Sequence, residues 1–433
     1  MNAQPSGTWV PGVRVTALSI VLTALAGGAH AEQAVKLDLQ VWNLSVKNLD
    51  TGPSPYHYGN SGNVFAGVEG DLHALANIPG ASFSLQYVFF PFMRGEGQPA
   101  QDNWQGKAGS YFAGAPMHND IDNGYLARFT WNQRLLHDRL ELAVGRTNAR
   151  QHFYMANCAN VITCNDPILD NATGILPYPY GSWGGYARYR FDSGNYLHSG
   201  VFESNPQHYF KGTKGFDWDP GDASGVSWLA GAGAQADFTQ NRYAYHYELN
   251  GFHNTGEQID PMDGRLRRGS DGLLFKFRQT LAREGQAAVP ERGWQVFGAW
   301  SWSADDMQPF SHFGEIGVTR LGPFGRPQDT LNLKASYLRL GARQAAWQES
   351  ARLQATGRDE RTRRGVSRVE LNTHWQVSRN LALEPSVQYI FNPDNFYNPS
   401  APVSGDGAVI ALQVMYNLGS CLLYTSDAAD ERS

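Results

Sequence analysis

Charged side chains stand between apolar neighbours throughout this sequence, and they are the residues whose chemistry needs explaining. Examples are Arg128, Glu248, Lys276, Lys334 and Glu370. A phosphate-selective pore is expected to collect only bases, and a simple cation pore only acids. Because both signs occur here, the pattern favours contact with a neutral polar solute, provided that one wall of a hydrated space gathers these side chains.

Catalytic motifs are absent from the sequence. There is no Gly-x-Ser-x-Gly elbow, and no short cluster joins a Ser, a His and a carboxylate, so a membrane-barrel hydrolase has little support. The acidic run with Asp217, Asp219 and Asp222 offers oxygen ligands for calcium but lacks the EF-hand spacing, which favours a surface loop. We therefore expect no enzyme, no cofactor and no metal site.

Two of the three cysteines, Cys158 and Cys164, lie close together in a polar stretch. In an oxidising compartment this spacing favours a small disulfide loop, and the alternative is a pair of free thiols. Nearby histidines do not complete a four-ligand zinc site.

Both ends of the chain differ from the rest. Residues 1–31 combine Arg14, an apolar stretch and Ala29-His30-Ala31, which predicts a secretory signal peptide, with a buried helix as the alternative. Residues 419–433 lack any periodicity and resemble a translated sequencing adapter, so we expect a non-native tail. The remaining domain, 32–418, has no composition break, and a net charge of −5 without a basic cluster gives no support to nucleic-acid binding.

Apolar residues alternate with polar ones along most of the domain. In Tyr125–Asn132, for instance, Tyr125, Ala127, Phe129 and Trp131 share one parity. This period of two predicts an all-β transmembrane antiparallel barrel, apolar outside and polar inside. Sixteen candidate strands cover 35–46, 63–73, 80–90, 123–133, 138–147, 182–191, 195–204, 226–238, 243–253, 271–281, 292–302, 312–321, 330–341, 365–377, 380–391 and 407–418.

Parity also divides the side chains between the two faces. Trp131, Trp228, Trp300, Trp302 and Trp375 fall on the outward face, as expected for interfacial girdles. The predicted inward residues are Asp38, Glu69, Asp71, Arg128, Arg188, Arg190, Asp237, His246, Glu248, Lys276, Arg278, Glu315, Lys334, Arg368, Glu370, Glu384 and Gln388.

Short connections alternate with long ones, as in bacterial outer-membrane barrels. Long external loops are expected at 91–122, 149–179, 205–225, 254–270 and 342–364, while Pro385 and the longer turns at 282–291 and 322–329 fit less well. By analogy with general porins, the loop at 149–179 after the fifth strand is the candidate for an inward-folded constriction. An external loop that never enters the lumen is the alternative.

Three motifs carry a resemblance to a known family. They are Gly62–Leu72 with Ile78-Pro79-Gly80, Leu140–Arg146, and Leu383–Pro393 with its Gln-Tyr and Asn-Pro. In this order and spacing they resemble the carbohydrate-selective porin (OprB) family.

This resemblance implies a Gram-negative outer-membrane porin that passes small sugars such as glucose passively through a zone of arginine, glutamate and aromatic side chains. Arg146 matches the family's Gly-Arg and Glu69 its acidic position, and Arg128, Arg188 and Trp183 are neighbours consistent with that zone. The implied partners are sugar solutes and outer-membrane lipid, with a homotrimer or a monomer both open. A porin for another small polar or aromatic solute, and a barrel-anchored binding or adhesion protein, are the alternatives.

Overall fold

The computed structural model describes residues 34–94, 105–113, 124–153, 166–206, 214–285 and 290–418. The predicted signal segment, the predicted tail and both Cys158 and Cys164 lie outside these residues. Within the described part of the chain, no helix combines the length and the apolar character needed to cross a membrane.

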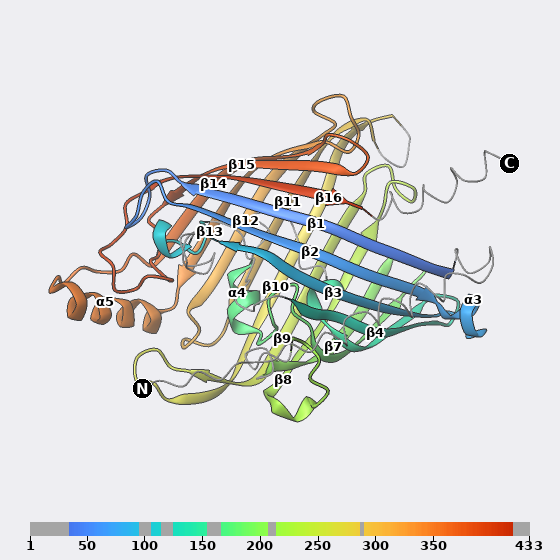
Figure 1. The fold of residues 1–433 in the computed structure, drawn as a ribbon, viewed down its shortest axis with the longest axis horizontal. Coiled ribbons are helices and arrows are strands. Elements are labelled where there is room, and N and C mark those ends of the chain that lie inside the picture. The colour runs from blue at the N-terminus through green and yellow to red at the C-terminus, as the bar shows by residue number, and fades with distance from the viewer. Residues whose placement is uncertain are drawn as a thin grey trace, which may run out of the picture.

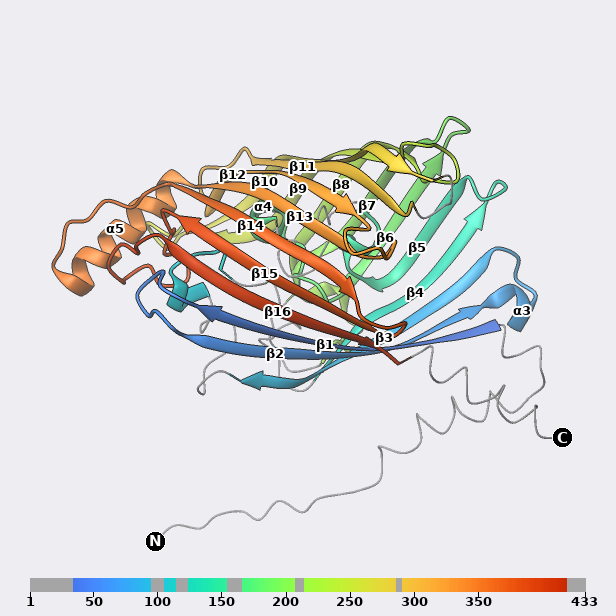
Figure 2. The ribbon, with the colours of Figure 1, turned by 90° about the horizontal axis from the view of Figure 1, so that it is seen from above.

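Sixteen antiparallel strands form a closed barrel in which each strand pairs with its chain neighbours and β1 pairs with β16 (Figures 1 and 2). The prediction of a sixteen-stranded barrel is confirmed. The strands are β1 Val35–Asn48, β2 Tyr58–Asp71, β3 Ala81–Arg94, β4 Tyr125–Leu135, β5 Leu140–Thr147, β6 Ser182–Arg190, β7 Asn195–Pro206, β8 Ala223–Ala236, β9 Tyr245–Ile259, β10 Leu266–Glu284, β11 Arg292–Ser303, β12 Phe310–Leu321, β13 Thr330–Leu340, β14 Gly365–Gln376, β15 Leu381–Phe391 and β16 Gly407–Asn417.

The two faces of the wall follow the alternation. Trp131, Trp228, Trp300 and Trp375 each expose 41–51% of their surface on the outward face, where a barrel presents its apolar band and aromatic girdles to lipid. Asp237 is a correction, because it lies in the turn after β8, where its carboxylate accepts hydrogen bonds from the turn backbone.

Irregularities alter local pairing at several points, and two of them bear on the predictions. The register shifts in the β3–β4 ladder, so that Tyr125 pairs with Val88 and is fully buried, whereas parity alone had put it outward. Pro385 lies inside β15 and pairs with Leu412 of β16 but has no register partner on β14, as expected for a residue without an N–H.

Connection lengths distinguish the two ends of the barrel. The end with the short helix α3 (Leu72–Ala76) carries short turns such as 136–139 and 191–194, which identifies it as periplasmic. The opposite, external end carries α5 (Ala342–Thr356) (Figure 1). The prediction of a long loop at 254–270 was wrong, because β9 and β10 extend and leave only residues 260–265 between them.

Candidate functional site

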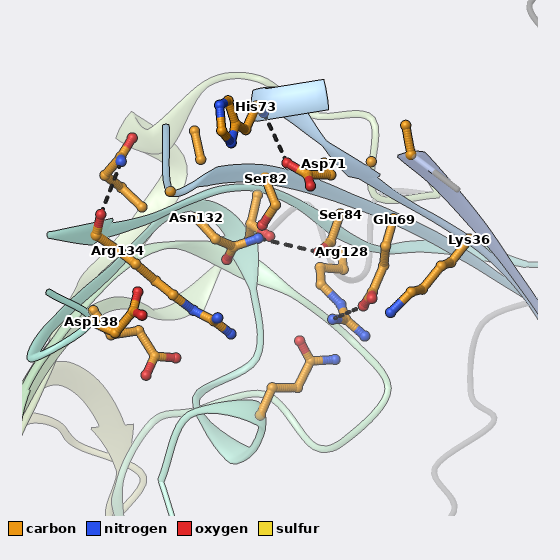
Figure 3. Close-up of a pocket in the computed structure, with 18 of the residues that line it drawn as sticks. Lys36, Glu69, Asp71, His73, Ser82, Ser84, Arg128, Asn132, Arg134 and Asp138 are labelled. Atoms are coloured by element: carbon orange, nitrogen blue, oxygen red, sulfur yellow. Dashed lines mark hydrogen bonds and ion pairs between the residues drawn. The ribbon is translucent and has the colours of Figure 1, made fainter. Parts of the chain in front are cut away.

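A cavity of about 690 Å³ opens on the lumen side of β1 to β5, at the α3 end of the barrel (Figure 3). Its lining mixes charges of both signs with hydroxyl and amide groups. The residues that line it include Lys36, Glu69, Asp71, Ser82, Ser84, Arg128, Asn132, Arg134, Glu141, Gln151 and His152. Inward alternate positions of neighbouring strands supply most of these side chains.

Glu69 and Arg128 form an ion pair across this cavity, with 3.6 Å between Oε1 and Nη1. Figure 3 shows the two side chains pointing toward each other. Their side chains are 55% and 26% exposed, so water or a solute hydroxyl can reach both groups. Lys36 is the register partner of Glu69 on β1, which places a second base beside the carboxylate. The predicted residues Glu69 and Arg128 are therefore brought together.

Arg188 belongs to the same site through Glu141. These two residues are register partners on β6 and β5, and Nη2 of Arg188 lies 2.5 Å from Oε2 of Glu141. Arg190 approaches the same carboxylate at 3.5 Å. Glu141 lines the cavity and Arg188 lies beside it, with the guanidinium of Arg188 also 5.7 Å from the ring centre of Tyr196.

The segment after β5 turns into the lumen beside these pairs. Its 3₁₀ turn η2 (Ala149–Gln151) ends at His152, whose ring stacks on the inward Tyr186 at 4.8 Å between centroids. Burial lowers the pKa of His152 to about 4. The imidazole is therefore neutral at pH 7 and presents a hydrogen-bonding ring, not a charge, to the cavity.

The same loop continues as helix α4 (Pro167–Ala172), which lies against the lumen wall. Asp166 caps this helix by accepting hydrogen bonds from the backbone N–H groups of Ile168 and Leu169. Its other oxygen contacts Ser301 and lies 2.5 Å from Nζ of Lys276. Asp166 and α4 therefore lie inside the barrel, against β10 and β11; that this loop narrows the channel stays a prediction.

A second segment, residues 105–113, also lies inside the barrel. The backbone N–H of Tyr111 donates to both oxygens of Asp394, at 3.1 and 3.0 Å, and Ser110 donates to the same carboxylate at 3.2 Å. On its other side, Arg368 donates to the carbonyl of Phe112 and lies 4.5 Å from its ring centre. Sequence reasoning missed this inward segment, which lies within the stretch predicted to be an external loop.

Charges on β12, β13 and β14 form a buried network beneath that segment. Lys334 lies 2.8 Å from Glu315 and 3.6 Å from Glu370, and Arg368 lies 3.7 Å from both carboxylates. All four side chains are buried. Their charges neutralise one another, and Arg368 also holds residues 105–113 through Phe112. Because they are buried, these four groups are less accessible to a solute than Glu69 and Arg128.

Arg146 and Trp183, two of the predicted constriction residues, lie outside the cavity. Arg146 pairs in register with Phe129, which is 43% exposed on the outer wall, and with Trp183. The guanidinium of Arg146 is fully buried and donates to Tyr125 Oη at 2.8 Å and to the carbonyl of Asp217 at 3.0 Å, and the indole of Trp183 donates to that same carbonyl. Neither residue lines the cavity, and this placement gives Arg146 no direct contact with a solute there.

The loop that supplies Asp217 folds over the outer wall. Its Trp218 packs against Phe129 and Trp183, with ring centroids 5.8 and 5.5 Å apart. Asp217 and Asp219 accept backbone hydrogen bonds within the loop. Among the residues that the structure describes, no group of three or more His, Cys, Asp and Glu is arranged to hold a metal ion.

A closed sixteen-stranded barrel with a polar lumen and inward-folded loops defines a porin-type channel. The family model of the carbohydrate-selective porins, OprB family, matches residues 57–418, and the chain belongs to this family. It is accordingly an outer-membrane sugar channel of a Gram-negative cell, a channel and not an enzyme by class.

Solved structures share the fold. The high-pH structure of Pseudomonas putida OprB is 17% identical, with a TM-score of 0.76 over 89% of this chain and 94% of that chain. Its low-pH structure gives a TM-score of 0.55 at 14% identity, over 93% and 97%. The outer-membrane channel DcaP of Acinetobacter baumannii gives 0.51 at 8% identity, over 88% and 96%. A comparison with curated proteins gives no match.

Proposed function

We propose that this channel passes neutral monosaccharides such as glucose by passive diffusion, and that the pairs Glu69–Arg128 and Glu141–Arg188 contact the sugar on its way. The observation that carries the proposal is that Glu69 and Arg128 form an ion pair at 3.6 Å while both side chains stay partly exposed. A carboxylate accepts from hydroxyl groups and a guanidinium donates to them, so a sugar can replace water at both without a net change in charge.

Aromatic surface completes such a site. The C–H face of a pyranose packs on a ring, and the half-buried imidazole of His152, which stacks on the buried Tyr186, lines the cavity close to Glu141 and Arg188. Arg146 and Trp183 are assigned a supporting role in this proposal: they fix the wall and the loop at 214–222 instead of touching the solute.

Diffusion down a gradient requires neither cofactor nor catalysis, and we propose none. Outer-membrane lipid surrounds the barrel, and a homotrimer or a monomer provides the same lumen. Another small polar or aromatic solute is the second candidate, favoured by the stacked rings in the lumen wall.

Liposome swelling tests the proposal. Proteoliposomes containing the refolded barrel should swell in isotonic glucose faster than in a disaccharide of the same osmolarity, and Arg128→Gln should slow the glucose rate. Arg320→Gln, at a base beside Trp294 near the periplasmic rim and outside the cavity, is the matched control. Equal swelling rates for Arg128→Gln and the parent would remove Arg128 from the sugar path, and no swelling would oppose a sugar channel.

A further inference from the structure

Basic side chains stand on the outer wall near the external rim of β12 and β13, a surface where such side chains are unusual. Arg339, the next-to-last residue of β13, pairs in register with His312 of β12 and with Gly365 of β14. Its parity is outward, and its side chain is exposed. His312 in turn pairs with Trp302 of β11. A base therefore stands on the lipid-facing side of the wall, where a barrel normally presents apolar residues.

Two residues further along β12, towards the membrane centre, Gly314 leaves a notch in the outer wall between two aromatic rings. Gly314 pairs with Trp300 on one side and Tyr337 on the other, and both rings are 42–45% exposed. A Cβ added at Gly314 would meet no atom within 4 Å. Exposed Trp and Tyr mark the headgroup level of a membrane, so Arg339 stands at or just outside that level.

The chain leading into β14 adds a further base, Arg363, to this face of the wall. The carbonyl of Arg364 accepts the N–H of Leu340 at 2.8 Å, so the β13–β14 pairing extends one residue past Gly365. Arg363 therefore alternates onto the outward side, where it donates to Asn392 at 2.6 Å. Among the described residues, no carboxylate forms an ion pair with Arg339, although the whole chain carries a net charge of −5.

We propose that this surface, the rim site formed by His312, Arg339 and Arg363 above the Gly314 notch, binds the phosphate of an outer-leaflet glycolipid, with an acyl chain in the notch. Guanidinium groups match phosphate oxygens in charge and in geometry. The wall faces lipid, so a lipid is the ligand that can present a phosphate and an apolar chain to this surface together. The inference rests on the outer-membrane location and is independent of which solute the lumen passes.

The test measures lipid binding to the intact barrel in detergent by native mass spectrometry. The probes are a bisphosphorylated glucosamine lipid (lipid A) and the same lipid without phosphates. The parent barrel should bind the phosphorylated lipid roughly tenfold more tightly. The double variant Arg339→Gln/Arg363→Gln should lose that preference, and Arg320→Gln, a base of the same strand pair at the periplasmic end, should keep it.

Two results would overturn the rim site. One is equal binding of both lipids by the parent barrel, a comparison that needs no variant and therefore no assumption about variant folding. The other is displacement of the phosphorylated lipid by millimolar inorganic phosphate, which would show a free-anion site. Glucose swelling measured in parallel should be unchanged in the double variant, so a failure of the rim site is distinguishable from a failure of the sugar channel.

Discussion

Lys276 on β10 and Asp166 at the start of α4 form a buried ion pair, with 2.5 Å between Nζ and Oδ2. This contact ties the loop after β5 to the lumen wall. Removal of one partner leaves a buried charge without compensation, which costs several kcal/mol, whereas removal of both costs much less.

Lys276→Met should therefore release α4 from the wall, with a local cost of about 3–5 kcal/mol. We expect faster hydrogen exchange in residues 166–172 and noisier single-channel current. The double variant Lys276→Met/Asp166→Asn should recover most of the protection. If the single variant keeps the exchange pattern of the parent, this ion pair does not hold the loop.

Asp394 should make the docking of residues 105–113 pH-dependent. Burial raises the pKa of this carboxyl from its usual 3.8 to about 6, although backbone N–H groups of Phe396 and Tyr111 oppose the shift. The docked state then binds more protons, so docking is strongest below pH of about 4 and weakens as the pH rises to about 6, by about 3 kcal/mol in total.

Hydrogen-exchange protection of the Tyr111 amide, corrected for the intrinsic pH dependence of exchange, measures this effect. Asp394→Asn should flatten the profile between pH 4 and 7. A profile with the same slope in both proteins would mean that another group controls the docking.

Glu69→Gln and Arg128→Gln should change ion selectivity in opposite directions. Loss of the carboxylate leaves Arg128 to attract anions, and loss of the guanidinium leaves Glu69 to attract cations. Because both side chains are partly exposed, we expect about twofold changes in the ratio of chloride to potassium permeability, obtained from reversal potentials in a KCl gradient. Glu284→Gln, at an exposed carboxylate outside the cavity, serves as the control, and shifts of the same sign in both variants would argue against the pair.

Cys158 and Cys164, which lie outside the described residues, are predicted to form a disulfide. The exported protein should show no reaction of these two residues with a thiol reagent until it is reduced. Labelling of both residues before reduction would favour the free thiols.

The strands could be predicted from sequence because lipid and water impose opposite demands on successive side chains. Glu141 shows the limit of this alternation as a signal. It alternates with Leu140 and Leu142 in a predicted strand, yet its role depends on Arg188, which β6 brings beside it. Arg146 shows a signal that was present but overlooked, since its even parity matches Leu142 and Val144 on the outer face.

Loop placement could not be predicted in the same way. Residues 105–113 enter the barrel because Asp394 and Arg368, which are remote in sequence, satisfy their backbone groups. His152 likewise reaches the cavity through a turn whose path depends on Asn148, which bonds the carbonyls of Leu176 and Tyr180. Such contacts have no periodicity, so composition and spacing do not reveal them.

Single-channel recording in planar bilayers tests the central claim most directly, with glucose added to the parent barrel and to the Glu69→Gln/Arg128→Gln double variant. The account predicts that glucose reduces the parent current in a concentration-dependent way and that the double variant, with its conductance retained, loses most of this block. An open channel whose current is insensitive to glucose, or equal block in both proteins, would contradict a sugar contact at Glu69 and Arg128.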